Sequence, residues 1–169
     1  MSDAEFEAFV WRFQDMVYGT AVRLLGNPAD AEDVAQTVFL RAFQRFAEIG
    51  ASPAAAGWLK TVTRNACLNH LSRYRRRWQA LDAPVEAALA SHDSPAERME
   101  MDEQRRELEQ ALRRLPDHQR VPLVLFHFEE MGYQEIAATL GVSLAKVKTD
   151  IFRAREALRR YLTRADASH

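Results

Sequence analysis

Hydrophobic residues recur every three or four positions along most of the chain, which is the spacing of amphipathic helices. The first such stretch, Phe6–Leu25, stops before Gly26, a residue type that favours a helix end. Asn27 and Pro28 follow, and they suit the cap and the first turn of a new helix. An apolar stripe then continues over Ala31–Phe46. The short connection predicts that these two helices pack antiparallel.

The stripe is interrupted at Gly50–Pro53, where glycine, serine and proline indicate a turn. A third helix is predicted around Trp58, and the polar residues Thr63–Asn65 are expected to interrupt it. A fourth helix is predicted to run through Leu68, Leu71 and Trp78. The first half of the chain is therefore predicted to be a small helical bundle.

The second half is set apart by composition. Residues 81–102 contain Pro84, Pro95, scattered alanine and serine and many acids, which is typical of a solvated linker. Beyond it, the spacing predicts a helix that Pro116 ends and a further helix whose apolar centre is Val121–Phe128. With only 6 glycines and 6 prolines, the chain is predicted to be all-α. The predicted organisation is a helical domain at 1–80, a flexible acidic linker at 81–102, a second small helical domain at 103–164 and a tail at 165–169.

Residues 133–158 have the spacing of a helix-turn-helix. The short predicted helix Tyr133–Leu140 is followed by Gly141, which can adopt the left-handed conformation of a turn, and by Ser143, a good N-cap. Val147 faces inward on the longer second helix, whose outer face suits the major groove of DNA. The candidate DNA-binding residues on this face are Lys146, Lys148, Thr149, Phe152 and Arg153.

The basic residues of this helix have a second explanation, because exposed helices often carry solvated arginines. The distribution of charge favours DNA binding, since a net charge of −1 hides strong segregation along the chain. Residues 51–81 carry six Lys and Arg and no acid, residues 82–110 carry nine acids, and residues 144–164 carry seven Lys and Arg against two acids. Two basic surfaces separated by an acidic spacer are predicted to contact a polyanion.

One face of the second helix predicts a protein-binding surface. Leu40 lies there, away from the apolar stripe, together with Asp33, Gln36 and Thr37. An outward leucine among polar groups is typical of a surface that binds another protein.

Between Trp58 and Trp78 the chain interleaves aromatic and basic residues. In proteins that hold single-stranded nucleic acid, cations follow the phosphates and rings stack on unpaired bases. Both tryptophans fit a hydrophobic core at least as well, so neither is counted as a site residue. The candidate residues for single-stranded DNA are Lys60, Arg64, Asn65, Arg73, Arg76 and Arg77.

Four stretches of the sequence, taken together, resemble extracytoplasmic-function (ECF) sigma factors, group 4 of the sigma-70 family. They occur in the family's order and cover both predicted domains. The resemblance implies an initiation subunit that binds core RNA polymerase and recognises the −35 and −10 promoter elements. The stretches are Asp-Ala-Glu-Asp-Val-Ala-Gln-Thr-Val-Phe-Leu-Arg at 30–41, Trp-Leu-Lys-Thr-Val-Thr-Arg-Asn at 58–65, Leu115-Pro116 with Arg120, and Tyr-Gln-Glu-Ile-Ala at 133–137 through Phe-Arg-Ala-Arg at 152–155.

The resemblance also implies roles for the two domains. The surface around Leu40 would bind the β′ clamp helices of the polymerase, and the second domain would bind the β flap and the −35 duplex. A loop between the third and fourth helices would capture a flipped base of the −10 element with Asn65 and its neighbours Arg64 and Ala66. Two departures from the family pattern are expected to matter: Asp150 replaces a frequent basic residue, and Thr61 and Thr63 make the expected −10 loop more polar.

The implied partners are core RNA polymerase, promoter DNA and an inhibitory anti-sigma factor. A stand-alone helix-turn-helix regulator is the alternative, with residues 1–80 sensing a ligand or mediating dimerisation. An enzyme is not expected, because the five histidines are scattered and no nucleophile has an evident base. No cofactor and no metal site are predicted, since Cys67 is the only cysteine. No apolar run approaches the length of a membrane span, so we expect a cytoplasmic protein.

Overall fold

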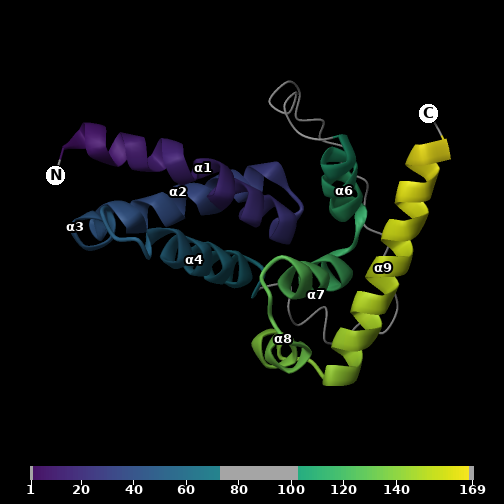
Figure 1. Cartoon of the computed structure of the whole chain (residues 1–169). Helices are drawn as coiled ribbons and strands as arrows, with labels where there is room; N and C mark the ends of the chain where they lie inside the picture. Colours follow the sequence, from purple (N-terminus) through teal and green to yellow (C-terminus); the bar gives the residue numbers. More distant parts are fainter. Residues whose placement is uncertain (1, 73–102, 168–169) are drawn as a thin grey trace. The chain divides into compact units, whose positions relative to one another are not determined.

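The structure is a computed structural model that describes residues 2–72 and 103–167, and throughout these ranges the fold is all-α. The chain divides into two compact units, Met1–Arg73 and Tyr74–His169. The predicted linker at 81–102 lies outside the described residues. The helices are α1 (Asp3–Leu25), α2 (Pro28–Gln44), α3 (Phe46–Ile49), α4 (Ala55–His70), α6 (Glu103–Arg114), α7 (Asp117–His127), α8 (Tyr133–Leu140) and α9 (Leu144–Ala167) (Figure 1).

The caps predicted between α1 and α2 are confirmed. Gly26 ends α1 in the left-handed conformation, with φ of 69°, and its N–H donates to the carbonyl of Val22 at 2.8 Å. The side chain of Asn27 accepts from the N–H groups of Ala29 and Asp30, and Pro28 opens α2. These hydrogen bonds satisfy helix-end groups that would otherwise lack a partner. The turn brings α2 back along α1.

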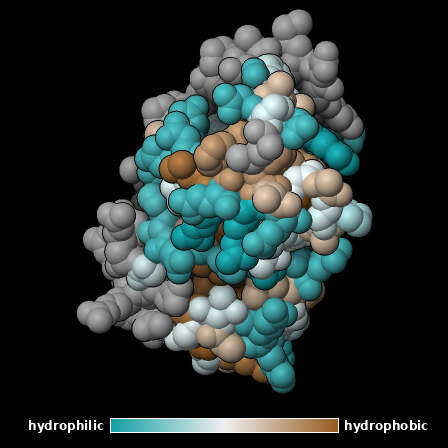
Figure 2. Space-filling model, turned by 90° about the vertical axis from the view of Figure 1, so that its left-hand side faces the viewer, coloured by the Kyte–Doolittle hydropathy of each residue, from teal (hydrophilic) through white to brown (hydrophobic). Residues whose placement is uncertain are grey.

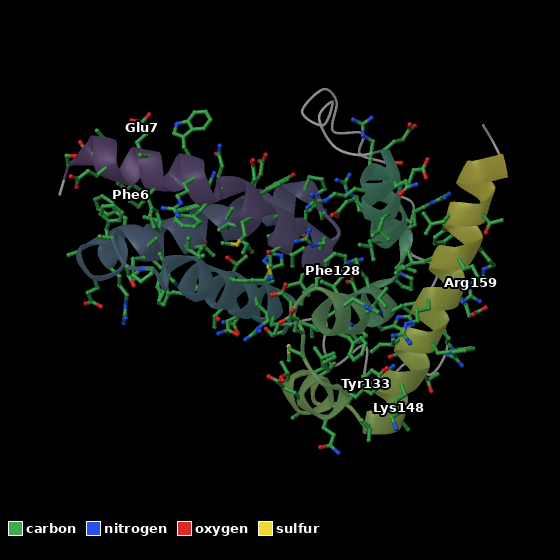
Figure 3. The ribbon with its side chains drawn as sticks, viewed as in Figure 1. Phe6, Glu7, Phe128, Tyr133, Lys148 and Arg159 are labelled. Carbon is green, nitrogen blue, oxygen red and sulfur yellow. The ribbon has the colours of Figure 1, made fainter. Side chains whose placement is uncertain are left out.

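The core of the N-terminal unit lies between α1, α2 and α4. Val17, Leu24, Val38 and Leu59 are fully buried there. At the end of the unit that carries α3, five phenylalanines pack in edge-to-face, tilted and stacked pairs whose ring centroids are 4.9–6.2 Å apart. Figure 3 labels one of them on α1. The five rings belong to Phe6, Phe9, Phe13, Phe43 and Phe46.

The predicted interruption of the third helix at Thr63–Asn65 is wrong, because α4 runs unbroken over Ala55–His70. Thr63 is fully buried, and its hydroxyl donates to the carbonyl of Leu59 at 2.6 Å. A threonine whose hydroxyl bonds to the preceding turn is compatible with a continuous helix. Thr63 therefore faces the core, and Asn65 lies within a helix rather than in a loop.

The C-terminal unit is built around α9, which packs against α6, α7 and α8. Pro116 precedes α7, and Pro122 is accommodated within α7. The guanidinium of Arg114 on α6 lies over the ring of Tyr161 on α9, 4.8 Å from its centroid. The helix α9 continues to Ala167, which lies within the segment predicted as a tail.

Candidate functional site

The helix-turn-helix is formed by α8, a short turn and α9. Gly141 adopts the left-handed conformation with φ of 70°, and its N–H and that of Val142 both donate to the carbonyl of Ala137, at 2.9 and 3.1 Å. Ser143 caps α9 by accepting from the N–H of Lys146 at 3.1 Å. Val147 is buried and fixes α9 against the other helices. The turn and capping residues therefore act as the sequence predicted.

Four predicted DNA-binding residues lie together on the outer face of α9: Lys148, Thr149, Phe152 and Arg153 are all exposed. We call this group the recognition surface. Phe152 is 63% exposed, although it is a large hydrophobic residue. Figure 3 shows Lys148 near the start of α9, at the end of the helix that adjoins α8. Cations, a hydroxyl and an aromatic ring are side chains that contact phosphates, base edges and thymine methyl groups.

Lys146 differs from the other four because it is paired within the protein. Its Nζ lies 2.8 Å from Oδ2 of Asp150, and the side chains are 18% and 7% exposed. Asp150 therefore points to the inside of the unit and not to the outer face. Its carboxylate balances the charge of Lys146.

His118 of α7 is buried close to this pair. Burial is the main cause that lowers its pKa, because a buried imidazole loses hydration on protonation. Asp150 and Asp117 act in the opposite direction, while Lys146 and Arg153 reinforce the lowering. The neutral form of His118 is therefore favoured, on a helix that packs against α9.

A second histidine lies beside α9, in a cluster that the sequence does not predict. Arg155 on α9 donates from Nε and Nη2 to Nε2 of His127 at the end of α7, at 3.3 and 3.1 Å. Its guanidinium also lies 5.6 Å from the ring centroid of Phe126, which stacks on Tyr133 at the start of α8. Three helices thus meet at one arginine. These residues are far apart in sequence, and no local sequence pattern predicts their contact.

Arg120, one of the residues on which the resemblance rests, is held by contacts within the C-terminal unit. It is 3% exposed, pairs with Asp117 and donates from Nη1 to the carbonyl of Leu115 at 2.9 Å. A buried guanidinium needs such partners, and here they join the start of α7 to the end of α6.

The predicted protein-binding surface lies on the exposed face of α2. Asp33, Gln36, Thr37 and Leu40 are all exposed, and Leu40 is 62% exposed. The hydroxyl of Thr37 donates to the carbonyl of Asp33 at 3.1 Å, which leaves the outer face of the helix undisturbed. Figure 2 shows one side of the molecule, where hydrophobic residues reach the surface among hydrophilic ones.

The candidate residues for single-stranded DNA are only partly brought together. Lys60 and Asn65 are exposed on α4, and Arg64, one turn after Lys60, is half-buried. Ala66 is 8% exposed and packs inward, so the expected loop that would capture a base with Asn65 and Ala66 is not present at this position. Arg73, Arg76 and Arg77 lie outside the described residues.

Comparison with known families accounts for both units. The family described as Sigma-70 region 2 matches residues 9–77, and the family described as Sigma-70, region 4 matches residues 105–158. The first match begins within α1 and extends through α4, and the second covers most of α6 to α9. The two regions follow each other in the order that the sequence predicted.

Among curated proteins, the chain is 36% identical to the ECF RNA polymerase sigma factor SigE of Mycolicibacterium smegmatis over 160 residues, which is 94% of this chain and 62% of that protein. It is 31% identical to the RNA polymerase sigma-H factor of Pseudomonas aeruginosa over 161 residues, which is 90% of this chain and 83% of that protein.

Among solved structures, the fold is similar to that of the sigma factor RpoE in its complex with the anti-sigma factor NepR from Bartonella quintana. The TM-score is 0.51 with 24% identity, and the match covers 94% of this chain and 96% of that one. Within the described ranges, no helix has the length and apolar character that a membrane span requires. Together with the two region matches, the curated relatives establish the family. The chain belongs to the ECF RNA polymerase sigma factors of the sigma-70 family.

Proposed function

We propose that the two units of this sigma factor divide promoter recognition between them. The N-terminal unit binds the β′ clamp helices of core RNA polymerase through Asp33, Gln36, Thr37 and Leu40. The observation that carries this assignment is the 62% exposure of Leu40 beside the exposed polar residues Asp33, Gln36 and Thr37, because exposed apolar side chains rimmed by polar groups mark protein interfaces.

The C-terminal unit binds the −35 element as duplex and contacts the β flap. The recognition surface enters the major groove, and Lys146 lies beside it with its charge balanced by Asp150. Exposed cations next to Thr149 and Phe152 support this assignment, because they combine phosphate contacts with contacts to base edges.

The −10 element is held as a single strand against the exposed side of α4, where Lys60, Arg64 and Asn65 follow one another along the helix. Basic residues that track the phosphates suit a separated strand. Arg73, Arg76 and Arg77 continue the same basic sequence, and we propose that they take part.

In the cell, the protein acts in the cytoplasm and an anti-sigma factor covers its polymerase-binding surfaces until a signal arrives. The solved complex of the RpoE relative with NepR supports an inhibitory partner of this kind. The stand-alone regulator is not favoured, because region 2 accounts for the unit to which that alternative assigns sensing or dimerisation.

The test is to capture genomic DNA fragments with the purified chain alone and with the chain bound to core polymerase. A sigma factor is expected to retain specific fragments strongly only together with core polymerase, because promoter melting needs the enzyme. Strong retention of the same fragments by the free chain, with no gain from core polymerase, would instead identify an ordinary DNA-binding regulator.

A further inference from the structure

The bond between Arg155 and His127 depends on the protonation state of the histidine. A guanidinium is protonated at all accessible pH values and only donates hydrogen bonds. Because Arg155 donates to Nε2 of His127, that nitrogen is unprotonated and the ring proton lies on Nδ1. Protonation of Nε2 removes the acceptor and places a second positive charge beside the guanidinium.

This cluster adjoins the recognition surface. Lys148, Phe152 and Arg155 are spaced four and three residues apart, so they lie along one side of α9, and all three are exposed. Tyr133, whose ring stacks on Phe126, comes from the first turn of α8. A duplex bound across the recognition surface therefore passes close to Arg155 and to the exposed His127.

The surroundings of His127 determine the direction in which its pKa is shifted. Burial, and then the charge of Arg155 from α9, lower its pKa. Tyr133 brings a phenol to the cluster from α8, and neither it nor the acids Glu129 and Glu130 of the turn after α7 are among the causes of the shift. At pH 7.5 His127 is therefore neutral and holds Arg155 against the protein. Below the ordinary range for histidine, the pair becomes two adjacent cations.

We propose that His127 and Arg155 form a pH-dependent phosphate-binding site at the edge of the recognition surface, which binds a phosphodiester of duplex DNA when His127 is protonated. A phosphodiester accepts hydrogen bonds from both side chains and balances both charges. An anion at this place also raises the pKa of His127, so DNA binding and proton uptake favour each other. The proposal rests on the proposed function, because it takes duplex DNA to be the ligand of the C-terminal unit.

The experiment compares the full-length chain with the variant His127→Gln, whose amide still accepts from Arg155 but takes up no proton. A 12-base-pair duplex of mixed sequence is titrated into each isotope-labelled protein at pH 7.5 and 5.5, and binding is followed by NMR at several salt concentrations. The wild type should gain about two- to fivefold more affinity at pH 5.5 than the variant. Its salt dependence should steepen by about 0.9, the slope of one phosphate contact.

The pH comparison between the two proteins separates His127 from His118, which remains in both. An equal change of affinity in the wild type and in His127→Gln would overturn the proposal. The variant Arg155→Gln gives a second test, because it should reduce the gain at pH 5.5, and an undiminished gain would contradict the site.

A third measurement needs no DNA. In the free wild-type chain, the Nε–Hε signal of Arg155 should shift along the titration curve of His127 and stay constant in His127→Gln. An Arg155 signal that does not change as His127 titrates in the wild type would refute the coupling between the two side chains. Failure of the proposed function has a different signature, because the chain would then not assemble with core polymerase at any pH.

Discussion

Leu40 is a large apolar side chain that the folding of its own unit leaves in water. If it anchors the polymerase interface, Leu40→Asp should weaken binding to core polymerase by about tenfold or more, since buried interface anchors contribute at least about 1–2 kcal/mol. Trp11→Asp is the matched control, because Trp11 is 70% exposed on α1 and lies outside the proposed surface. Competition binding of labelled chains to core polymerase measures both. Equal affinities of wild type and Leu40→Asp would argue against the interface.

Glu130 adopts a backbone conformation that costs stability. Its φ is 58°, in the left-handed region, within the turn between α7 and α8. Glycine reaches this region without strain, so Glu130→Gly should stabilise the C-terminal unit by about 0.5–1 kcal/mol. Glu130→Gln keeps the strain and removes the charge, and it should leave stability nearly unchanged. Urea unfolding monitored at residues of α7–α9 compares the variants, and a destabilised Glu130→Gly would contradict the strain.

At the scale of elements, Gly50, the residue after α3, must be glycine because it lies in close contact with that helix. A Cβ on Gly50 would lie 2.8 Å from both Cε2 and the carbonyl oxygen of Phe46. Gly50→Ala should therefore destabilise the N-terminal unit by about 1–3 kcal/mol, the usual cost of overpacking. A Cβ on Gly57 of α4 meets nothing within 4 Å, so Gly57→Ala should stabilise the same unit by about 0.5 kcal/mol. Thermal unfolding that ranks the two variants in the reverse order would disprove this account.

The elements that the sequence predicted well are those with local signals. Asn27, Gly26, Gly141 and Ser143 each determine a helix end through their own backbone or side chain, and the structure shows these ends as expected. The sequence does not predict the continuity of α4, because Thr63 is a polar residue whose hydroxyl is satisfied by its own helix. The polarity of a threonine alone does not show whether its side chain faces the core or the solvent.

The candidate site residues also divide into those that local sequence signals predict and those that only folding brings together. The outer positions of α9 follow from helical spacing once the turn is placed, and the pairing of Lys146 with Asp150 could have been read from their four-residue separation. The contact of Arg155 with His127 joins residues 28 positions apart on different helices. Only the packing of three helices brings these two side chains together, so sequence spacing could not predict it.

At the scale of the whole molecule, the C-terminal unit should be more stable at neutral than at acidic pH. Burial lowers the pKa of both His118 and His127 below the ordinary histidine value of 6.5. The unfolded chain therefore takes up protons first, so stability is fully present above about pH 6.5 and is lost as the pH falls through the lowered values. His118→Gln should flatten this dependence between pH 7.5 and 5. Urea unfolding followed by NMR signals of α9 measures it, and an equal slope in both proteins would exclude His118 as a cause.

Initiation requires both units to act on one promoter. Substitutions in the proposed binding surfaces of the two units should therefore impair transcription in different ways. Leu40→Asp should reduce transcription from every promoter, because less of the chain joins the polymerase at a given concentration. Arg153→Ala should still join the polymerase but lose promoters that depend on a −35 element, at a cost of about 1–3 kcal/mol for one base contact.

The most direct measurement is transcription in vitro with purified core polymerase, this chain and fragmented genomic DNA of its source, with the 5′ ends of the transcripts sequenced. We expect start sites that arise only when the chain is added, that share upstream elements at −35 and −10, and that respond to the two substitutions as described. Folded chain that neither joins the core polymerase nor produces a new start site would contradict the account.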